Sequence, residues 1–296
     1  MKKYWFKIYS IFILFILNFY TANAEITFSD LQKIYPKNLK NISVPASNFI
    51  SEYSAKYNKT VEIDTVYYYA DNFKIYGLLY KPLKKKANAG IVIAHGYYPA
   101  ETYFQGQGTF STGVKLAEEG FIVIIPDYRG YYKSEGGNSY PYPGESIDII
   151  AAAKTLEQKY KLKNIYLIGY SWGGGIAATA AEISAVFDKL VLYYPQLGGV
   201  EINPREFSML KNHPQLKFTG RQIIEFFENK SPLYNSNLIN IPTLVFHGKN
   251  DTTVKPEQSE KLAELMKKSG KNIELIIYND YRHAFADGPD NKSWKK

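Results

Sequence analysis

Asn164-Ile165-Tyr166-Leu167-Ile168-Gly169-Tyr170-Ser171-Trp172-Gly173, with the small-residue run 174–181 after it, is the stretch from which the fold can be inferred. An apolar run leads into Gly-x-Ser-x-Gly, which predicts a strand, a sharp turn and a helix with Ser171 at the turn. Such a turn lifts the serine hydroxyl clear of the sheet and aims the first amides of the helix at it. We therefore interpret Ser171 as a candidate nucleophile. The alternative is a glycine-rich turn whose serine only caps the helix.

Two segments in which polar and apolar residues alternate, and a series of continuous apolar runs, surround this turn in the sequence. Segments 61–69 and 74–81, joined by Ala70-Asp71-Asn72, predict an antiparallel pair at the start of the domain. The apolar runs are 90–94, 121–125, 165–168, 190–194, 243–246 and 273–278. Helical patterns separate them at 112–119, 144–160 and 256–268, and from 172 onward. Continuous apolar strands alternating with helices predict an α/β fold with a doubly wound, mostly parallel sheet of eight strands.

The expected domain covers 61–296 and follows an N-terminal extension at 25–60, in which Phe49–Tyr53 fits a short helix. A stretch with three prolines at about 196–241 interrupts the alternation of strands and helices. We interpret it as a small cap insertion over the site. The alternative is a surface excursion with no role in substrate binding.

The first 24 residues have the pattern of an export signal. Three lysines precede an apolar core at 11–17, and Ala22-Asn23-Ala24 is a small-x-small cleavage site. We expect cleavage after Ala24 and a secreted or periplasmic protein. The alternative is an uncleaved N-terminal membrane anchor. No other segment is long and apolar enough to cross a bilayer.

Charge and cysteine content exclude several kinds of partner and of functional site. The formal net charge is +8, and removal of 1–24 takes away three lysines and no acids, which leaves +5. This surplus is modest and the run Lys84-Lys85-Lys86 fits a solvated loop, so no nucleic-acid partner is expected. The chain has no cysteine, which excludes disulfides, thiol catalysis and thiolate metal sites. No His/carboxylate cluster has metal-ligand spacing, so neither a metal nor another cofactor is expected.

A serine nucleophile needs a base to take its proton and an acid to hold that base in the right tautomer. His283 follows the last predicted strand, in a loop at the carboxyl edge of the sheet, and is the candidate base. His95 and His247 end earlier strands, and we interpret them as residues that shape turns. His213, inside the expected cap, is interpreted as solvated.

The candidate acid is Asp251, in the loop directly after the run 243–246. Glu260, on an expected helix, and Asp280, at a strand end, are weaker alternatives. The order Ser171, Asp251, His283 along the chain is the order of the α/β-hydrolases.

Acyl transfer also requires donors for the developing oxyanion. The backbone N–H of Trp172, at the helix start, is one candidate, and that of Tyr97, in the loop after the run 90–94, is the second. Tyr97, Tyr98, Tyr131, Tyr132 and Trp172 could line an aromatic substrate pocket, which favours apolar or aromatic acyl groups. The alternative is that these rings only pack.

The chain resembles the α/β-hydrolases, and most of all the catalytic domain of prolyl-oligopeptidase-type serine peptidases and the dienelactone-hydrolase-like esterases. The resemblance spans about 61–285. The matching segments are His95-Gly96, Asp127-Tyr128-Arg129-Gly130 with Ser134 and Gly136, Gly169–Gly174, and Ser231-Pro232 through His247-Gly248 and Asp251 to His283-Ala284-Phe285. It implies a serine hydrolase that acts on a small ester or peptide through an acyl-enzyme. It also implies that Asp127 and Arg129 support the loop beside the site, as a buried ion pair or a loop brace.

Three features depart from the prolyl-oligopeptidase pattern. About 36 residues separate the expected signal from the first strand, which leaves no room for a β-propeller. Tyr131-Tyr132 stands where that family usually has glycine and small residues. Only 13 residues follow His283, where relatives usually have a helix. A small-acyl esterase and a small-peptide peptidase therefore both remain open, with a non-catalytic binding protein of the same fold as the alternative. The sequence does not indicate an oligomeric state.

Overall fold

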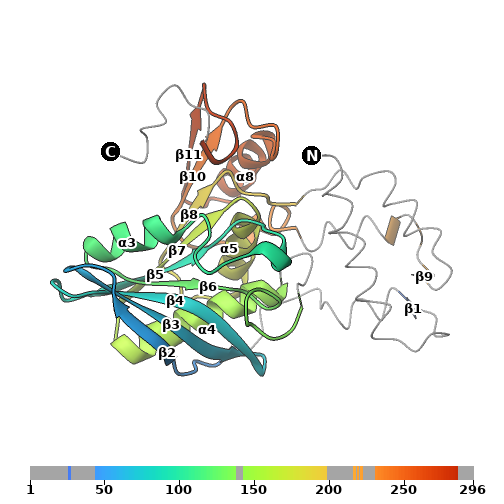
Figure 1. Cartoon of the computed structure of the whole chain (residues 1–296). Coiled ribbons are helices and arrows are strands. Elements are labelled where there is room, and N and C mark those ends of the chain that lie inside the picture. The colour runs from blue at the N-terminus through green and yellow to red at the C-terminus, as the bar shows by residue number, and fades with distance from the viewer. Residues whose placement is uncertain are drawn as a thin grey trace.

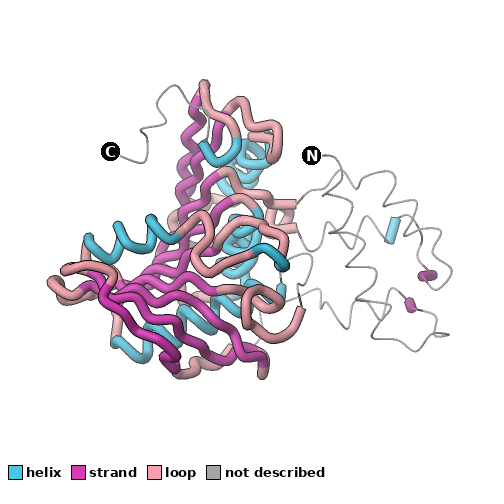
Figure 2. The backbone as a smooth tube through the Cα atoms, viewed as in Figure 1, coloured by secondary structure: helices cyan, strands magenta, loops and turns pink. Residues whose placement is uncertain are grey.

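A sheet of nine strands runs through the part of the chain that the structure describes (Figures 1 and 2). The computed structural model describes residues 44–137, 143–198 and 231–285, with the short pieces 26–27, 216–217, 219 and 221–222. The strands of the sheet are β2 (Ile50–Lys56), β3 (Val61–Ala70), β4 (Phe73–Pro82), β5 (Ala89–Ala94), β6 (Ile122–Pro126), β7 (Asn164–Tyr170), β8 (Lys189–Tyr193), β10 (Thr243–Gly248) and β11 (Ile273–Tyr278).

The strand order is β11-β10-β8-β7-β5-β6-β4-β3-β2. All neighbours from β11 to β6 are parallel, whereas the β6–β4, β4–β3 and β3–β2 pairs are antiparallel. This arrangement confirms the doubly wound, mostly parallel sheet and its leading antiparallel pair. Apart from it, β1 (Ile26–Thr27) pairs with β9 (Leu216–Lys217) in parallel.

The sheet has one strand more than the eight that the sequence predicts. The additional strand is β2, so the expected short helix at Phe49–Tyr53 is wrong. β2 is an edge strand whose residues are almost all exposed, and a bulge between Ser51 and Tyr53 shifts its pairing with β3. Because neither face of β2 is buried, its sequence lacks the alternation that marks a strand.

Helices cover both faces of the sheet (Figure 1). α3 (Phe110–Glu118) packs on one face, and α4 (Pro143–Tyr160), α5 (Trp172–Ile183) and α8 (Glu257–Lys268) pack on the other. Successive residues of β5 divide between these two layers: Ile91 and Ile93 belong to the core with α3, and Val92 and Ala94 to the core with the other three helices. A strand buried on both faces is apolar throughout, as its sequence is.

Short 3-10 turns complete the described part: η2 (Ala100–Thr102), η3 (Ser236–Leu238) and η4 (His283–Phe285). Val44 and Phe49, which the sequence assigns to the N-terminal extension, are buried in the core with α4. The expected signal at 1–24, most of the expected cap and residues 286–296 lie outside the described residues. Within the described part, no helix has both the length and the hydropathy that a membrane span needs.

Candidate active site

Ser171 occupies the sharp turn between β7 and α5 that the sequence predicts. Its backbone has φ 52° and ψ −119°, in the region that non-glycine residues rarely adopt. Two of its three backbone hydrogen bonds join this strained residue to the end of β8 and the segment after it: the N–H of Ser171 donates to the carbonyl of Tyr193 at 3.0 Å, and the N–H of Gln196 donates to the carbonyl of Ser171 at 2.8 Å. The segment after β8 therefore fixes the turn from the side.

The glycines around Ser171 are required by close backbone contacts. A Cβ at Gly173 would overlap the carbonyl oxygens of His95 and Ala94, and a Cβ at Gly169 would lie 2.7 Å from the Cβ of Ala177. Because β5 and the first turn of α5 approach this closely, the loop after β5 comes to lie beside Ser171.

His283 and Asp251 continue a line of hydrogen bonds from the serine. The Nε2 atom of His283 lies 3.0 Å from Ser171 Oγ, and its Nδ1 atom lies 2.7 Å from Asp251 Oδ2. A carboxylate can only accept, so Nδ1 carries the proton and Nε2 is free to accept from the serine hydroxyl. The other oxygen, Asp251 Oδ1, accepts the backbone N–H groups of Thr253 at 2.8 Å and Val254 at 2.9 Å.

Asp251 is held in its charged form. Burial raises its pKa, but hydrogen bonds from His247, from His283 and from the N–H of Val254 outweigh that effect and leave the pKa well below its usual value. The carboxylate is therefore available at all pH values near neutrality to orient the imidazole of His283 and to balance its charge.

His247 is a residue that the sequence reasoning did not assign to the site. Its Nε2 atom lies 3.2 Å from Asp251 Oδ2, the same oxygen that accepts from His283. The signal available in the sequence was the His-Gly-x-x-Asp spacing, which alone does not reveal that the ring turns back onto the aspartate. Of the other candidates, Glu260 and Asp280 are exposed, and His213 lies outside the described residues.

The loop after β5 brings the backbone of Gly96 and Tyr97 to the serine. A Cβ added at Gly96 would lie 3.6 Å from the Cβ of Ser171. The Nδ1 atom of His95 donates to the carbonyl of Gly96 at 2.7 Å. Because the C=O and N–H of a trans peptide point in opposite directions, this bond turns the N–H of Tyr97 away from His95. That N–H and the one of Trp172, at the start of α5, remain our predicted oxyanion donors.

His95 is a neutral, fully buried ring inside an aromatic cluster. It stacks between Tyr128 at 4.2 Å and Tyr103 at 4.8 Å between ring centres. Burial lowers its pKa to about 4, although the hydrogen bond to the carbonyl of Gly96 acts in the opposite direction. The cluster fixes the position at which the chain leaves β5, which agrees with the expected role of His95 in shaping a turn.

Three of the four predicted pocket tyrosines gather near Trp172 and His95. Tyr131 is fully buried, and its hydroxyl donates to the carbonyl of Tyr98 at 2.9 Å. Tyr132 turns outward with φ 51° and packs on Tyr76. Tyr98 is half-buried, and the partly exposed ring of Tyr97 stands edge-to-face on Trp172 at 6.1 Å. A role for these rings in binding substrate stays a prediction.

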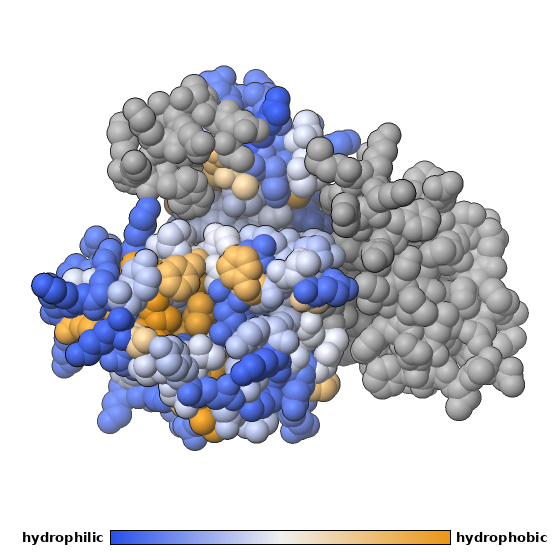
Figure 3. Space-filling model, in the orientation of Figure 1, coloured by the Kyte–Doolittle hydropathy of each residue, from blue (hydrophilic) through white to orange (hydrophobic). Residues whose placement is uncertain are grey.

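A large apolar side chain is exposed on the loop between β5 and α3. Phe104, between β5 and α3, is 62% exposed. The described surface in Figure 3 is mostly hydrophilic, with a group of apolar residues left of the centre of the view.

Asp127 and Arg129 do not pair with each other, contrary to one of the two roles that the resemblance implies. Arg129 forms a bidentate ion pair with Asp148 of α4, with Nη2 at 2.7 Å from Oδ1 and Nε at 3.1 Å from both carboxylate oxygens. Asp127 instead accepts from the hydroxyl of Tyr103 at 2.6 Å and the amide of Gln105 at 2.5 Å. Each residue therefore braces a loop beside the site, through a partner that the sequence does not identify.

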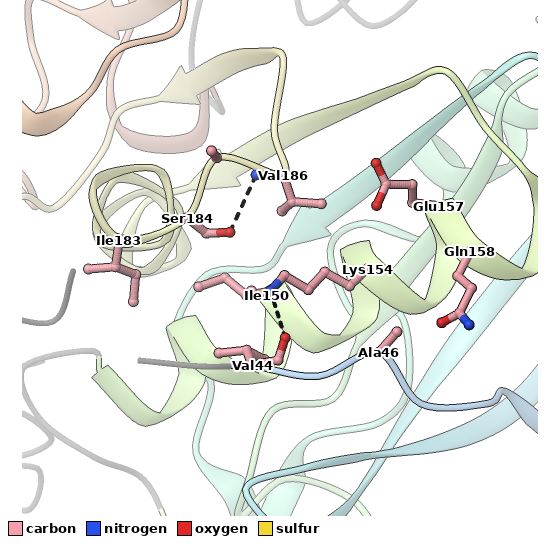
Figure 4. Close-up of a pocket in the computed structure, with 10 residues that line it drawn as sticks. Val44, Ala46, Ile150, Lys154, Glu157, Gln158, Ile183, Ser184 and Val186 are labelled. Carbon is pink, nitrogen blue, oxygen red and sulfur yellow. Dashed lines mark hydrogen bonds between the residues drawn. The ribbon is translucent and has the colours of Figure 1, made fainter. Parts of the chain in front are cut away.

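A cavity of about 690 Å³ lies elsewhere, between α4, the end of α5 and the segment at Val44 (Figure 4). Lys154 crosses it to donate to the carbonyl of Val44 at 2.7 Å. None of the predicted site residues lines this cavity, so we assign it no part in the reaction. Among the described residues no group of three His, Asp or Glu side chains could hold a metal ion.

Comparisons with known proteins agree with the fold described above. A model described as the dienelactone hydrolase family matches residues 75–295. An uncharacterized peptidase of Bacillus subtilis, YtmA, is 26% identical over 246 residues, which cover 76% of this chain and 87% of that protein.

Two solved structures illustrate the likeness in fold. Acetyl xylan esterase 1 of a Thermoanaerobacterium species superposes with a TM-score of 0.64 at 15% identity, over 86% of this chain and 88% of that one. The acylaminoacyl peptidase of Pyrococcus horikoshii gives 0.58 at 19% identity, over 78% of this chain but 39% of that one. At these identities the structural likeness shows the α/β-hydrolase fold.

Proposed function

This chain belongs to the dienelactone hydrolase family, and from that premise we propose that it cleaves an ester or amide bond through an acyl-enzyme formed on Ser171. The family and the named relatives make it a hydrolase of the esterase or peptidase kind. The observation that carries the finer proposal is the line of hydrogen bonds from Ser171 through His283 to Asp251, at 3.0 Å and 2.7 Å.

In the first half of the proposed reaction, Ser171 Oγ attacks the acyl carbon while its proton moves to His283 Nε2. Asp251 balances the charge of the imidazolium and keeps Nδ1 protonated. The oxygen of the tetrahedral intermediate accepts from the N–H groups of Tyr97 and Trp172. When the intermediate collapses, Nε2 gives its proton to the leaving alcohol or amine, and the acyl group remains on the serine.

In the second half, water attacks the acyl-serine and gives a proton to the same Nε2 atom. Collapse of the second intermediate releases the carboxylic acid and returns the proton to Ser171 Oγ. The strained backbone of Ser171 supports this assignment, because strain of this kind persists where the surroundings hold a residue in a functional geometry.

The expected substrate is a small ester or a short peptide. The partly exposed ring of Tyr97, which stands on Trp172 next to the serine, supports a preference for apolar or aromatic acyl groups. A panel of p-nitrophenyl acyl esters and aminoacyl anilides would rank esterase against peptidase activity.

A fluorophosphonate probe tests the proposal directly. We expect the wild-type protein to be labelled and Ser171→Ala to remain unlabelled. Ser111→Ala is the matched control, because Ser111 is an exposed serine of α3, and it should be labelled like the wild type. A folded wild-type protein that is not labelled would overturn the proposal and favour a non-catalytic binding protein.

We also propose that residues 1–24 direct export and are removed after Ala24, so that the enzyme is secreted or periplasmic. The sequence pattern supports this. N-terminal sequencing of the protein recovered from its cell should give Glu25 as the first residue, and recovery of an intact N-terminus with the membranes would favour an anchor. The cap over the site at about 196–241 is a further part of the proposal. Replacing 199–230 with a short linker, which keeps Gln196 and the buried residues Leu197 and Leu233, should change substrate preference.

A further inference from the structure

The carboxylate of Asp251 contacts two imidazoles through one oxygen. Oδ2 lies 2.7 Å from His283 Nδ1 and 3.2 Å from His247 Nε2. The two amides that bind Oδ1 come from the loop of Asp251 itself. His247 comes from β10, so it connects the carboxylate of the acid to the sheet.

The hydrogen bonds of His247 define its tautomer. Its Nε2 atom faces two acceptors, the carbonyl of Val254 at 3.0 Å and Oδ2 of Asp251 at 3.2 Å, so Nε2 carries the proton. Its Nδ1 atom lies 2.7 Å from the hydroxyl of Ser259, on α8. In the neutral ring Nδ1 accepts, so Ser259 donates. His247 and Ser259 are both fully buried, and no solvent can exchange with these partners.

We propose that His247 is a positioning residue for the acid, tying Asp251 to α8 through Ser259 and taking up part of the charge that Asp251 presents to His283. This inference rests on the proposed function of Asp251 and His283. His247 does not touch substrate or the serine, so it acts through Asp251.

A purely structural role is the competing explanation. In that case His247 would only brace the turn by donating to the carbonyl of Val254, and its replacement would lower stability without changing the titration of the catalytic base. A positioning role has a different consequence. Without the His247 donor, the charge on Oδ2 is shared only with His283. The imidazolium of His283 is then better stabilised. The fall of kcat/KM toward low pH, the acid limb of the pH profile, therefore moves to higher pH.

The groups that face this carboxylate in the described structure are His247 from β10, His283 from η4 and Tyr194 after β8. Tyr194 packs on His283 through its ring. A change in the acid limb on replacing His247 therefore reports on the contact between His247 and Asp251, provided that Tyr194 is left intact.

Three variants of the full chain separate the explanations. His247→Leu fills the space but has no donor. His247→Gln keeps an N–H near the place of Nε2. Ser259→Ala removes one hydroxyl and leaves the imidazole in place, so it is informative even where His247→Leu fails to fold. For each we would measure kcat/KM for p-nitrophenyl acetate from pH 5 to 9, together with the thermal unfolding midpoint.

We expect His247→Leu to lose about 10- to 100-fold in kcat/KM, by analogy with the outer partners of metal-ligating histidines, with its acid limb at higher pH. Ser259→Ala should show a smaller loss in the same direction, and His247→Gln should recover most of the activity and the wild-type limb. A folded His247→Leu with the wild-type profile would overturn the inference, as would a His247→Gln no better than His247→Leu. Where His247→Leu does not fold, a Ser259→Ala profile identical to the wild type would do so.

Fluorophosphonate labelling separates this result from failure of the proposed function. If the wild type is labelled and the three variants are labelled at the same rate, the positioning role alone is wrong. If the wild type is not labelled, the proposed function fails first.

Discussion

The ring of Tyr194 stands edge-on against the imidazole of His283, with the ring centres 4.7 Å apart. Tyr194 follows β8 with φ 40°, a conformation that is uncommon for a bulky side chain, and its N–H donates to the carbonyl of Phe246 at 2.7 Å. The same ring contacts Phe285 at 5.3 Å. The ring of Tyr194 therefore covers one side of the proposed catalytic base.

Replacing Tyr194 should affect activity through loss of this ring contact with His283. Tyr194→Ala removes a buried aromatic ring, which typically costs about 3–5 kcal/mol of stability, and it should lower kcat more than it raises KM because His283 gains freedom. Tyr194→Phe keeps the ring and should retain kcat. Steady-state kinetics and thermal unfolding of both variants check this. A low kcat in Tyr194→Phe would instead show that the hydroxyl is required.

The free energy of unfolding should depend on pH because of Asp127. Burial raises its pKa from the ordinary 3.8 to about 7, although the Tyr103 and Gln105 donors oppose the shift. The folded state therefore binds the proton more tightly than the unfolded state. The contribution of this carboxyl group to stability is fully present below pH 3.8 and is lost as the pH rises through about 7. Its size is about 1.4 kcal/mol per unit of difference between the folded and unfolded pKa. Urea unfolding at pH 4.5, 6 and 8 should show wild-type stability falling relative to Asp127→Asn. Parallel pH dependences for the two proteins would contradict this.

Gly173 should tolerate no side chain. The added Cβ of Gly173→Ala would meet the backbone carbonyl oxygens of Ala94, the last residue of β5, and of His95, the residue after it. Overpacking of this kind costs about 1–3 kcal/mol or more. The matched control is Gly96→Ala, whose Cβ would have its nearest neighbours at 3.6 Å. Thermal unfolding should separate the two variants, and equal midpoints would show that β5 and α5 can move apart.

The order of strands and helices could be predicted because buried parallel strands are apolar throughout. Ser171, Asp251 and His283 each follow such a strand, so their place at one edge of the sheet could be inferred, and the structure brings the three side chains within hydrogen-bonding distance. β2 could not be inferred, because an exposed edge strand carries no pattern of burial.

Contacts that depend on how a loop turns could not be inferred either. Asp148 lies 19 residues beyond Arg129, on α4, and only the packing of that helix shows that it replaces Asp127 as the partner. Tyr131 and Tyr132 are adjacent in sequence, but the positive φ of Tyr132 sends one ring into the core and the other outward.

The ion pair between Arg129 and Asp148 should contribute strongly to stability. Burial raises the pKa of Asp148, and Arg129 acts against that effect. Asp148→Asn leaves the buried guanidinium without its full partner, and breaking a buried pair in this way costs about 3–5 kcal/mol. Glu264→Gln is the matched control, because it removes the exposed ion pair with Lys261 on α8. It should leave the unfolding midpoint unchanged, whereas a stable Asp148→Asn protein would show that the pair contributes little.

Asp251→Asn should abolish most activity while the protein remains folded. The amide of asparagine can accept the N–H groups of Thr253 and Val254 through its oxygen, which leaves its NH₂ group facing His283. A donor at that position favours the tautomer with the proton on Nε2, which cannot accept from Ser171. In a serine protease the same substitution lowers kcat by about 10⁴. Asp280→Asn is the control, because Asp280 is an exposed acid in the neighbouring loop and was the weaker candidate from the sequence. Hydrolysis of p-nitrophenyl acetate should fail for Asp251→Asn alone. Loss of activity in Asp280→Asn with activity kept in Asp251→Asn would transfer the role of the acid to Asp280.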